Sequence, residues 1–113
     1  MVAFTDLQAL LQTLADVNRL RILSFIGNES RPVSEIVKST RLSQPLVSHH
    51  LRVMKEAGVL VPERRGPFIL YSLKEPRLLE ILGVLGEMAP ETGGRARRAP
   101  AFRCPPWWGR IGS

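Results

Sequence analysis

The chain has 113 residues, of which 44% are hydrophobic and 23% are charged. This is the composition of an ordinary globular protein with room for one domain. No run approaches the roughly 18 consecutive apolar residues of a membrane-spanning helix, which excludes an integral membrane protein. Residues 1–6 lack the basic segment and apolar run of a secretory signal, so we expect a cytoplasmic protein. A single cysteine, Cys104, excludes an intramolecular disulfide and a multi-cysteine metal site.

The positive charge is concentrated in two segments. The chain holds 16 Lys and Arg against 10 Asp and Glu, a net charge of +6. Residues 92–113 contain five arginines and no acid, and residues 31–65 contain seven bases and three acids. A local excess of base fits a nucleic-acid-binding face, and it fits an ordinary solvated surface equally well.

Apolar residues at helical spacing predict five helices. Their expected ranges are residues 6–14, 17–26, 35–40, 44–57 and 76–88. The first helix has a start signal in Thr5 and Gln8, which fit a capping box. Asp16, Ser34 and Ser43 are placed to cap the next three helices.

Glycines and β-prone runs complete the predicted order. Gly27 and Gly58 are natural stops for the second and fourth helices, and residues 28–32 are expected to form a loop. Two β-prone segments, 59–63 and 68–73, flank the sequence Arg-Arg-Gly-Pro at 64–67. They predict a hairpin with a basic tip before the last helix.

Two short helices joined by a tight turn and followed by a hairpin predict a winged helix-turn-helix. This is a mainly α fold of the α+β type, in the order α-α-α-α-β-β-α. An α-helix fits the major groove of DNA, and the preceding helix braces it across the backbone. The free amides at the start of the fourth helix suit a phosphate. We expect one DNA-binding and dimerisation domain over 1–91 and a basic extension over 92–113.

Two segments resemble the ArsR/SmtB family of bacterial transcriptional repressors. They read LADVNRLRIL at 14–23 and LSQPLVSHHLRVMKEAG at 42–58, and the YSL at 71–73 is similar to the end of the family's wing. The resemblance covers residues 5–89. It implies a homodimeric repressor that binds an inverted-repeat operator in double-stranded DNA and leaves it when an effector binds.

The resemblance also assigns a DNA-facing side to the fourth helix and the wing. Gln44 would read an adenine edge or contact phosphate, and Ser43 and Ser48 would contact phosphate. Pro67 stands where a basic or polar residue is usual, which argues against deep insertion of the wing tip. Taken as isolated residues, Gln44, Ser48 and Arg52 would equally form a solvated helix face. The expected DNA-binding residues are Ser43, Gln44, Ser48, His49, Arg52, Arg64 and Arg65.

The last predicted helix is more apolar than one buried stripe requires. Seven of the eleven residues from 78 to 88 are apolar. A monomer would leave much of that surface exposed, whereas a second copy would bury it. The resemblance implies dimerisation through the first and last helices. The expected interface residues are Leu7, Leu10, Leu11, Leu78, Leu82 and Leu85.

We expect no metal and no cofactor, and the effector is unidentified. Where many relatives carry a Cys-x-Cys at the third helix, this chain has Pro, Val and Ser at 32–34, and these cannot bind a soft metal. Residues 74–91 hold no histidine for the metal site that other relatives have on the last helix. His49 and His50 point about 100° apart on a helix, so they do not form a chelate. One is expected to face DNA and the other to be partly buried.

The extension at 92–113 allows three interpretations. It could be a basic arm on DNA phosphates, an aromatic anchor through Phe102, Trp107 and Trp108, or an appendage without function. Cys104 is a candidate redox-active thiol in the same segment.

The competing functional class is a protein-interaction module, which the aromatic extension favours and the basic recognition helix disfavours. An enzyme is not expected, because the sequence offers no nucleophile–base pair, no paired acids and no glycine-rich phosphate loop.

Overall fold

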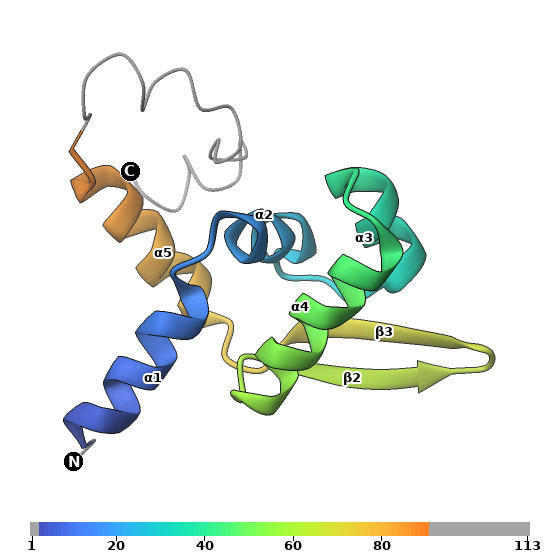
Figure 1. Cartoon of the computed structure of the whole chain (residues 1–113), viewed down its shortest axis with the longest axis horizontal. Helices are drawn as coiled ribbons and strands as arrows, with labels where there is room; N and C mark the ends of the chain where they lie inside the picture. Colours follow the sequence, from blue (N-terminus) through green and yellow to red (C-terminus); the bar gives the residue numbers. More distant parts are fainter. Residues whose placement is uncertain (1–2, 91–113) are drawn as a thin grey trace.

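The computed structural model describes residues 3–90, which form five helices and a small three-stranded sheet. In chain order these are α1 (Phe4–Leu14), α2 (Val17–Ile26), β1 (Arg31–Pro32), α3 (Val33–Thr40), α4 (Gln44–Glu56), β2 (Leu60–Arg65), β3 (Phe68–Leu73) and α5 (Arg77–Met88). Helices α1 and α5 lie together at one end, the hairpin of β2 and β3 extends at the other, and α2, α3 and α4 lie between them (Figure 1). The predicted mainly α, winged helix-turn-helix fold is confirmed.

Two of the predicted caps are confirmed. One carboxylate oxygen of Asp16 accepts from the backbone N–H groups of Asn18 and Arg19, at 2.9 and 3.0 Å. The Ser43 hydroxyl oxygen accepts from the N–H of Leu46 at 3.3 Å. Each cap satisfies donors that a helix start leaves without an intrahelical partner, so these two helices begin where the sequence predicts.

The other two predicted caps are wrong. Helix α1 begins at Phe4, with Ala3 as its N-cap and no side-chain cap bond, so Thr5 lies inside the helix. Helix α3 begins at Val33 rather than at residue 35, and Pro32 is its N-cap. Because Pro32 also belongs to β1, the chain passes directly from strand to helix and Ser34 falls within the first turn.

The loop predicted over 28–32 is wrong at its last two residues. Arg31 and Pro32 form β1 and pair antiparallel with Tyr71 and Leu70 of β3, which gives the sheet order β1-β3-β2. A strand of two residues has no alternation to detect, and its position depends on a partner about 40 residues away in the chain.

The hairpin is tighter than predicted. Strands β2 and β3 are in register from Leu60 opposite Leu73 to Arg65 opposite Phe68, so only Gly66 and Pro67 form the turn. The φ of Gly66 is +60°, a conformation that glycine adopts without steric cost. Glycine followed by a proline, whose φ is locked near −65°, fits a type II′ turn. Pro67 thus has a structural role at the wing tip.

One apolar core holds these elements together. It joins α2 and α4 to α3, to the base of the hairpin and to the inner side of α5. Its buried members are Leu14, Ile22, Leu23, Ile26, Ile36, Val47, Leu51, Met54, Val59, Leu60, Leu73, Leu79 and Leu82.

Candidate nucleic-acid interface

Helix α4 has one buried and one exposed side. Its buried side consists of Val47, His50, Leu51 and Met54. The exposed side carries four of the predicted DNA-binding residues, Gln44, Ser48, His49 and Arg52. Leu46, next to the buried Val47, is 37% exposed. The core therefore turns the polar side of this helix outward.

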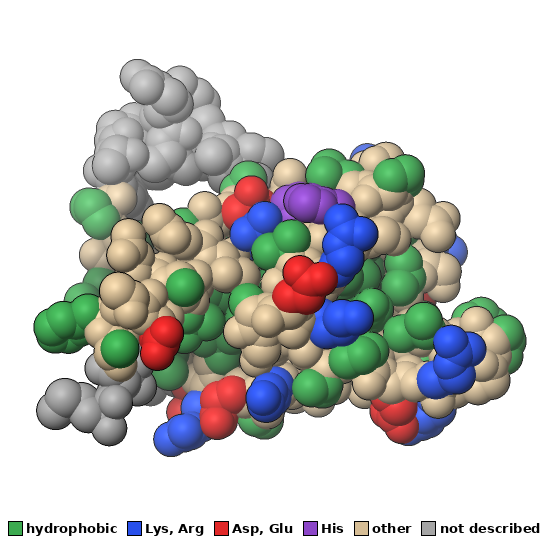
Figure 2. Space-filling view, turned by 60° about the horizontal axis from the view of Figure 1, so that its bottom comes forward, with side chains coloured by type: hydrophobic (Ala, Val, Ile, Leu, Met, Phe, Trp, Pro, Cys, Tyr) green, Lys and Arg blue, Asp and Glu red, His purple; other side chains and the backbone are tan. Residues whose placement is uncertain are grey.

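Basic side chains on α4 are available to a ligand. Within residues 3–90, neither Arg52 nor Lys55 makes an ion pair within 4.0 Å, and both are exposed. Lys55 was not among the predicted residues, although its position three residues after Arg52 puts it on the same side of the helix. Figure 2 shows basic side chains beside the histidines on this face, with acidic side chains between them. The surface is mixed rather than uniformly basic.

The two wing arginines are consecutive residues at the end of β2. Successive residues of a strand point to opposite faces, so Arg64 and Arg65 are directed apart. The Arg65 Nε lies 3.2 Å from the Glu63 carboxylate. Arg65 also lines a hollow of about 570 Å³ between α3 and the hairpin, together with Ser34 and Phe68. Arg64 is exposed and makes no ion pair within the described part of the chain.

The two histidines differ in burial, as predicted. His49 is exposed, whereas His50 is only 5% exposed. Their ring centroids are 5.5 Å apart and the rings are tilted by 58°. Between residues 3 and 90, no group of three or more His, Cys, Asp or Glu side chains is arranged to hold a metal ion.

The predicted dimer residues fall into three groups. Leu7, Leu11 and Leu85 are exposed, while Leu10 and Leu78 are partly buried against the core. Leu82 is 6% exposed and belongs to the core of the chain itself, so the structure places it beneath the surface.

Further large apolar residues on the same two helices are exposed and were missed by sequence reasoning: Phe4, Ile81, Val84 and Met88. The apolar excess of the last helix was the signal that could have found three of them.

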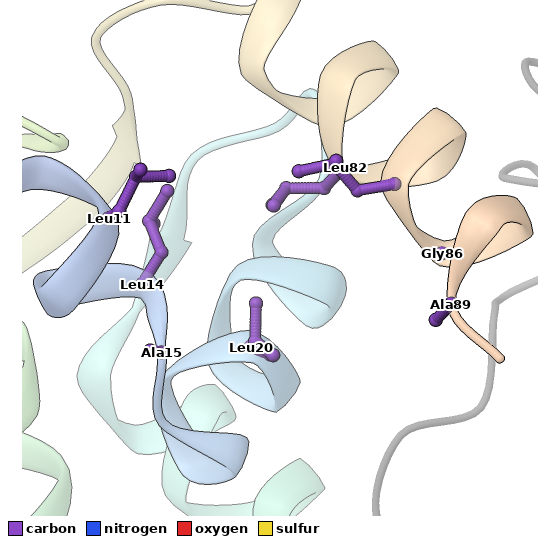
Figure 3. A pocket seen from close by; sticks show the side chains of 8 residues that line it. Leu11, Leu14, Ala15, Leu20, Leu82, Gly86 and Ala89 are labelled. Carbon is purple, nitrogen blue, oxygen red and sulfur yellow. The ribbon is translucent and has the colours of Figure 1, made fainter. Parts of the chain in front are cut away.

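An apolar hollow of about 350 Å³ separates the two terminal helices (Figure 3). Side chains of Leu11 and Leu14 from α1 and of Leu82 from α5 border it, with Leu20 of α2 at its floor. Its remaining lining residues are Ala15, Leu85, Gly86 and Ala89. A hollow with this lining offers dispersion contacts and no polar recognition.

Other sequence predictions concern residues outside 3–90. The aromatic and arginine residues of the extension and the candidate thiol Cys104 lie beyond the described residues. Of the helices in residues 3–90, none is both long and apolar enough to cross a membrane.

Comparison with known proteins agrees with this geometry. Residues 16–60, which contain α2, α3 and α4, match the family model described as bacterial regulatory protein, arsR family. The transcriptional regulator NmtR of Mycobacterium tuberculosis is 35% identical over 80 residues, covering 71% of this chain and 67% of NmtR. The repressor SmtB of the same organism is 40% identical over 73 residues, covering 65% of this chain and 54% of SmtB. The chain thus spans between half and two thirds of these relatives.

A solved structure also matches over most of the chain. The crystal structure of Rv0081 from Mycobacterium tuberculosis superimposes with a TM-score of 0.68 at 31% identity, covering 78% of this chain and 90% of Rv0081. The similarity therefore includes the terminal helices as well as the helix-turn-helix. On the sequence match, the structural match and the shared architecture, this chain belongs to the ArsR family of bacterial regulatory proteins.

Proposed function

We propose that this protein is a homodimeric transcriptional repressor that binds an inverted-repeat operator and is released from it by an effector. In this proposal residues 1–91 are the DNA-binding and dimerisation domain, and 92–113 are an extension to it. The observation that carries the proposal is the exposed polar side of α4, whose arginine has no acidic partner among the described residues.

The exposed side of α4 has the chemistry of a recognition helix. A glutamine amide can pair with the edge of adenine, and an arginine can pair with guanine or neutralise a phosphate. Gln44 stands at the first position of α4 and Arg52 two turns later, so both reach the same groove. The Ser43 oxygen accepts a bond in the helix cap and its hydroxyl proton remains to be donated, which supports a phosphate contact.

The terminal helices supply the dimer in this proposal. Phe4, Leu7, Leu11, Ile81 and Leu85 are exposed on α1 and α5, at the end of the molecule opposite the wing (Figure 1). Exposed apolar side chains at this density mark an interface in a soluble protein. A second copy related by a two-fold axis would present its own α4 to the next major groove, about 34–36 Å away.

The effector is proposed to be something other than a thiophilic metal bound at α3. Pro32 ends β1, and Val33 and Ser34 form the first turn of α3. None of the three side chains provides a thiolate, which soft metals require.

Selection of genomic fragments on the purified full chain tests the proposal. We expect enrichment of one inverted repeat, with binding that weakens steeply as salt is raised, because bound phosphates release counterions. Gln44→Ala and Arg52→Ala should each weaken binding to the selected site by roughly tenfold, the value of one base or phosphate contact.

Lys74→Ala is the matched control, since it removes an exposed positive charge from the segment between β3 and α5. Its affinity should stay within about twofold of that of the unmodified chain, since one charge distant from the DNA is largely screened at moderate salt. If no sequence is enriched, or if all three variants bind alike, the recognition helix does not read DNA as proposed.

A further inference from the structure

A side chain of α2 is hydrogen-bonded to the buried side of the recognition helix. The Arg19 Nε lies 3.1 Å from Nδ1 of His50, two residues that are 31 positions apart in the chain. Arg19 also donates from Nη1 to the carbonyl oxygen of Thr13 at 3.1 Å. One guanidinium thus joins α1, α2 and α4.

The direction of this hydrogen bond determines the charge state of the histidine. A guanidinium nitrogen can only donate, so Nδ1 of His50 must be unprotonated to accept. The proton of the neutral ring is then on Nε2, which is buried and has no hydrogen-bond partner within the described residues. Protonation of Nδ1 would set two donors and two positive charges against each other at 3.1 Å.

The groups around the His50 ring shift its pKa in opposite directions. Burial lowers the pKa of His50 below its ordinary value of 6.5. The carboxylate of Asp16, at the start of α2, acts to raise this pKa, while Arg19 and the neighbouring His49 lower it. These are the charged and titratable groups of residues 3–90 that act on the ring, and their balance favours the neutral form.

We propose that Arg19 and His50 form a positioning pair that holds α4 in its DNA-binding orientation only while the His50 ring is neutral. His50 acts through α4 and does not itself touch DNA, because its side chain is buried beneath the exposed face that carries Ser48, His49 and Arg52. Loss of the bond would remove this polar link between α2 and α4 and leave the Arg19 guanidinium without its acceptor on His50. The inference rests on the proposed function, because its consequence is a change in operator affinity.

Two substitutions of His50 distinguish the role of its hydrogen bond to Arg19 from the role of its side-chain volume. His50→Asn places an amide oxygen near the position of Nδ1 and cannot titrate, whereas His50→Leu retains apolar bulk without an acceptor. At pH 8, we expect the Asn variant to bind the selected inverted repeat within about twofold of the parent chain. The Leu variant should bind about tenfold more weakly, as expected when a charged donor loses its buried partner.

The pH profile is measured in a His49→Gln background. His49 is exposed on the face proposed to meet DNA, so His49→Gln leaves His50 as the histidine of α4 in this measurement. In this background, operator affinity should fall as the pH is lowered through the pKa of His50, which burial holds below 6.5, with a slope that approaches tenfold per pH unit. Adding His50→Asn to this background should remove the dependence of operator affinity on pH. A slope that persists in the double variant, or a Leu variant that binds like its parent at pH 8, would overturn the proposal.

A DNA-free measurement distinguishes this inference from the proposed function. In NMR spectra of the full chain with His49→Gln, here the parent, the backbone amides of α4 should shift with the titration of the His50 ring and stay fixed when His50→Asn is added. If the parent chain shows these shifts but selects no operator, the proposed function fails and the positioning pair stands. Amides that do not move overturn the pair even where the operator binds. Because the parent and the Asn variant suffice here, the test holds even if the Leu variant does not fold.

Discussion

The Arg21 guanidinium donates from Nη2 to the carbonyl oxygen of Thr40 at 2.6 Å. Thr40 is the last residue of α3, and the next residue, Arg41, has a φ of +62° as the chain turns toward α4. The Thr40 hydroxyl itself donates to the carbonyl oxygen of Ile36 at 2.7 Å. Arg21 therefore secures the turn of the helix-turn-helix from the side of α2.

Replacing Arg21 by Met should lower the free energy of unfolding by about 1–3 kcal/mol. The substitution retains much of the aliphatic stem and leaves the Thr40 carbonyl without its charged donor. Urea unfolding followed by circular dichroism measures the change. Arg77→Met is the control, because Arg77 pairs with Glu75 on the open surface and such pairs contribute little. Equal unfolding midpoints for the two variants would show that the Arg21 contact does not stabilise the turn.

Gly66 is expected to be intolerant of a side chain for conformational reasons alone. A Cβ at this position would meet nothing within 4 Å, yet the φ of +60° is unfavourable for alanine. Gly66→Ala should therefore destabilise the protein by about 1 kcal/mol. Gly66→Asn should cost less, because asparagine is among the residues that, with glycine, dominate the positive-φ positions of hairpin turns. Thermal unfolding of the two variants gives the comparison, and an Ala variant as stable as the parent would contradict the turn geometry.

Leu85 is a test of the proposed dimer. Its side chain is 46% exposed on α5, so Leu85→Glu should leave the monomer folded and prevent a second copy from packing there. Sedimentation velocity should show the parent chain as a dimer and the variant as a monomer. Val17→Glu is the matched control, since Val17 is 47% exposed at the start of α2, outside the two terminal helices. A Leu85→Glu variant that still sediments as a dimer would exclude this face.

The stability of the fold should depend on pH through His50. Burial lowers the pKa of His50 in the folded chain, so the unfolded chain binds the proton more readily. Its contribution to stability is therefore complete above pH 6.5 and is lost as the pH falls below that value. Urea unfolding of the parent and of His50→Asn between pH 8 and 5 should give midpoints that diverge on the acid side. Parallel midpoints would show that the folded chain does not disfavour the charged ring.

Local signals were sufficient for two of the four predicted helix starts, and they failed at Thr5 and Ser34. Asp16 and Ser43 start their helices, as predicted, because a capping side chain bonds to backbone groups two or three residues away. Gly27 ends α2, as predicted, with a φ of +58° that glycine adopts without steric cost. The polar side of α4 was predictable as well, since helical spacing alone decides which residues share a side. The contact between Arg19 and His50 had no such signal, because it joins positions 31 residues apart.

The order of the helices and hairpin, the outward side of α4 and the apolar excess of α5 were determined by the sequence, through periodicity and capping. The tertiary structure decided the details that depend on distant partners. It formed β1 against β3, continued the pairing of β2 with β3 as far as Arg65, placed Leu82 in the core and buried His50 against Arg19. The physical reason is that spacing along a helix specifies which side is apolar, whereas burial depends on which other element covers that side.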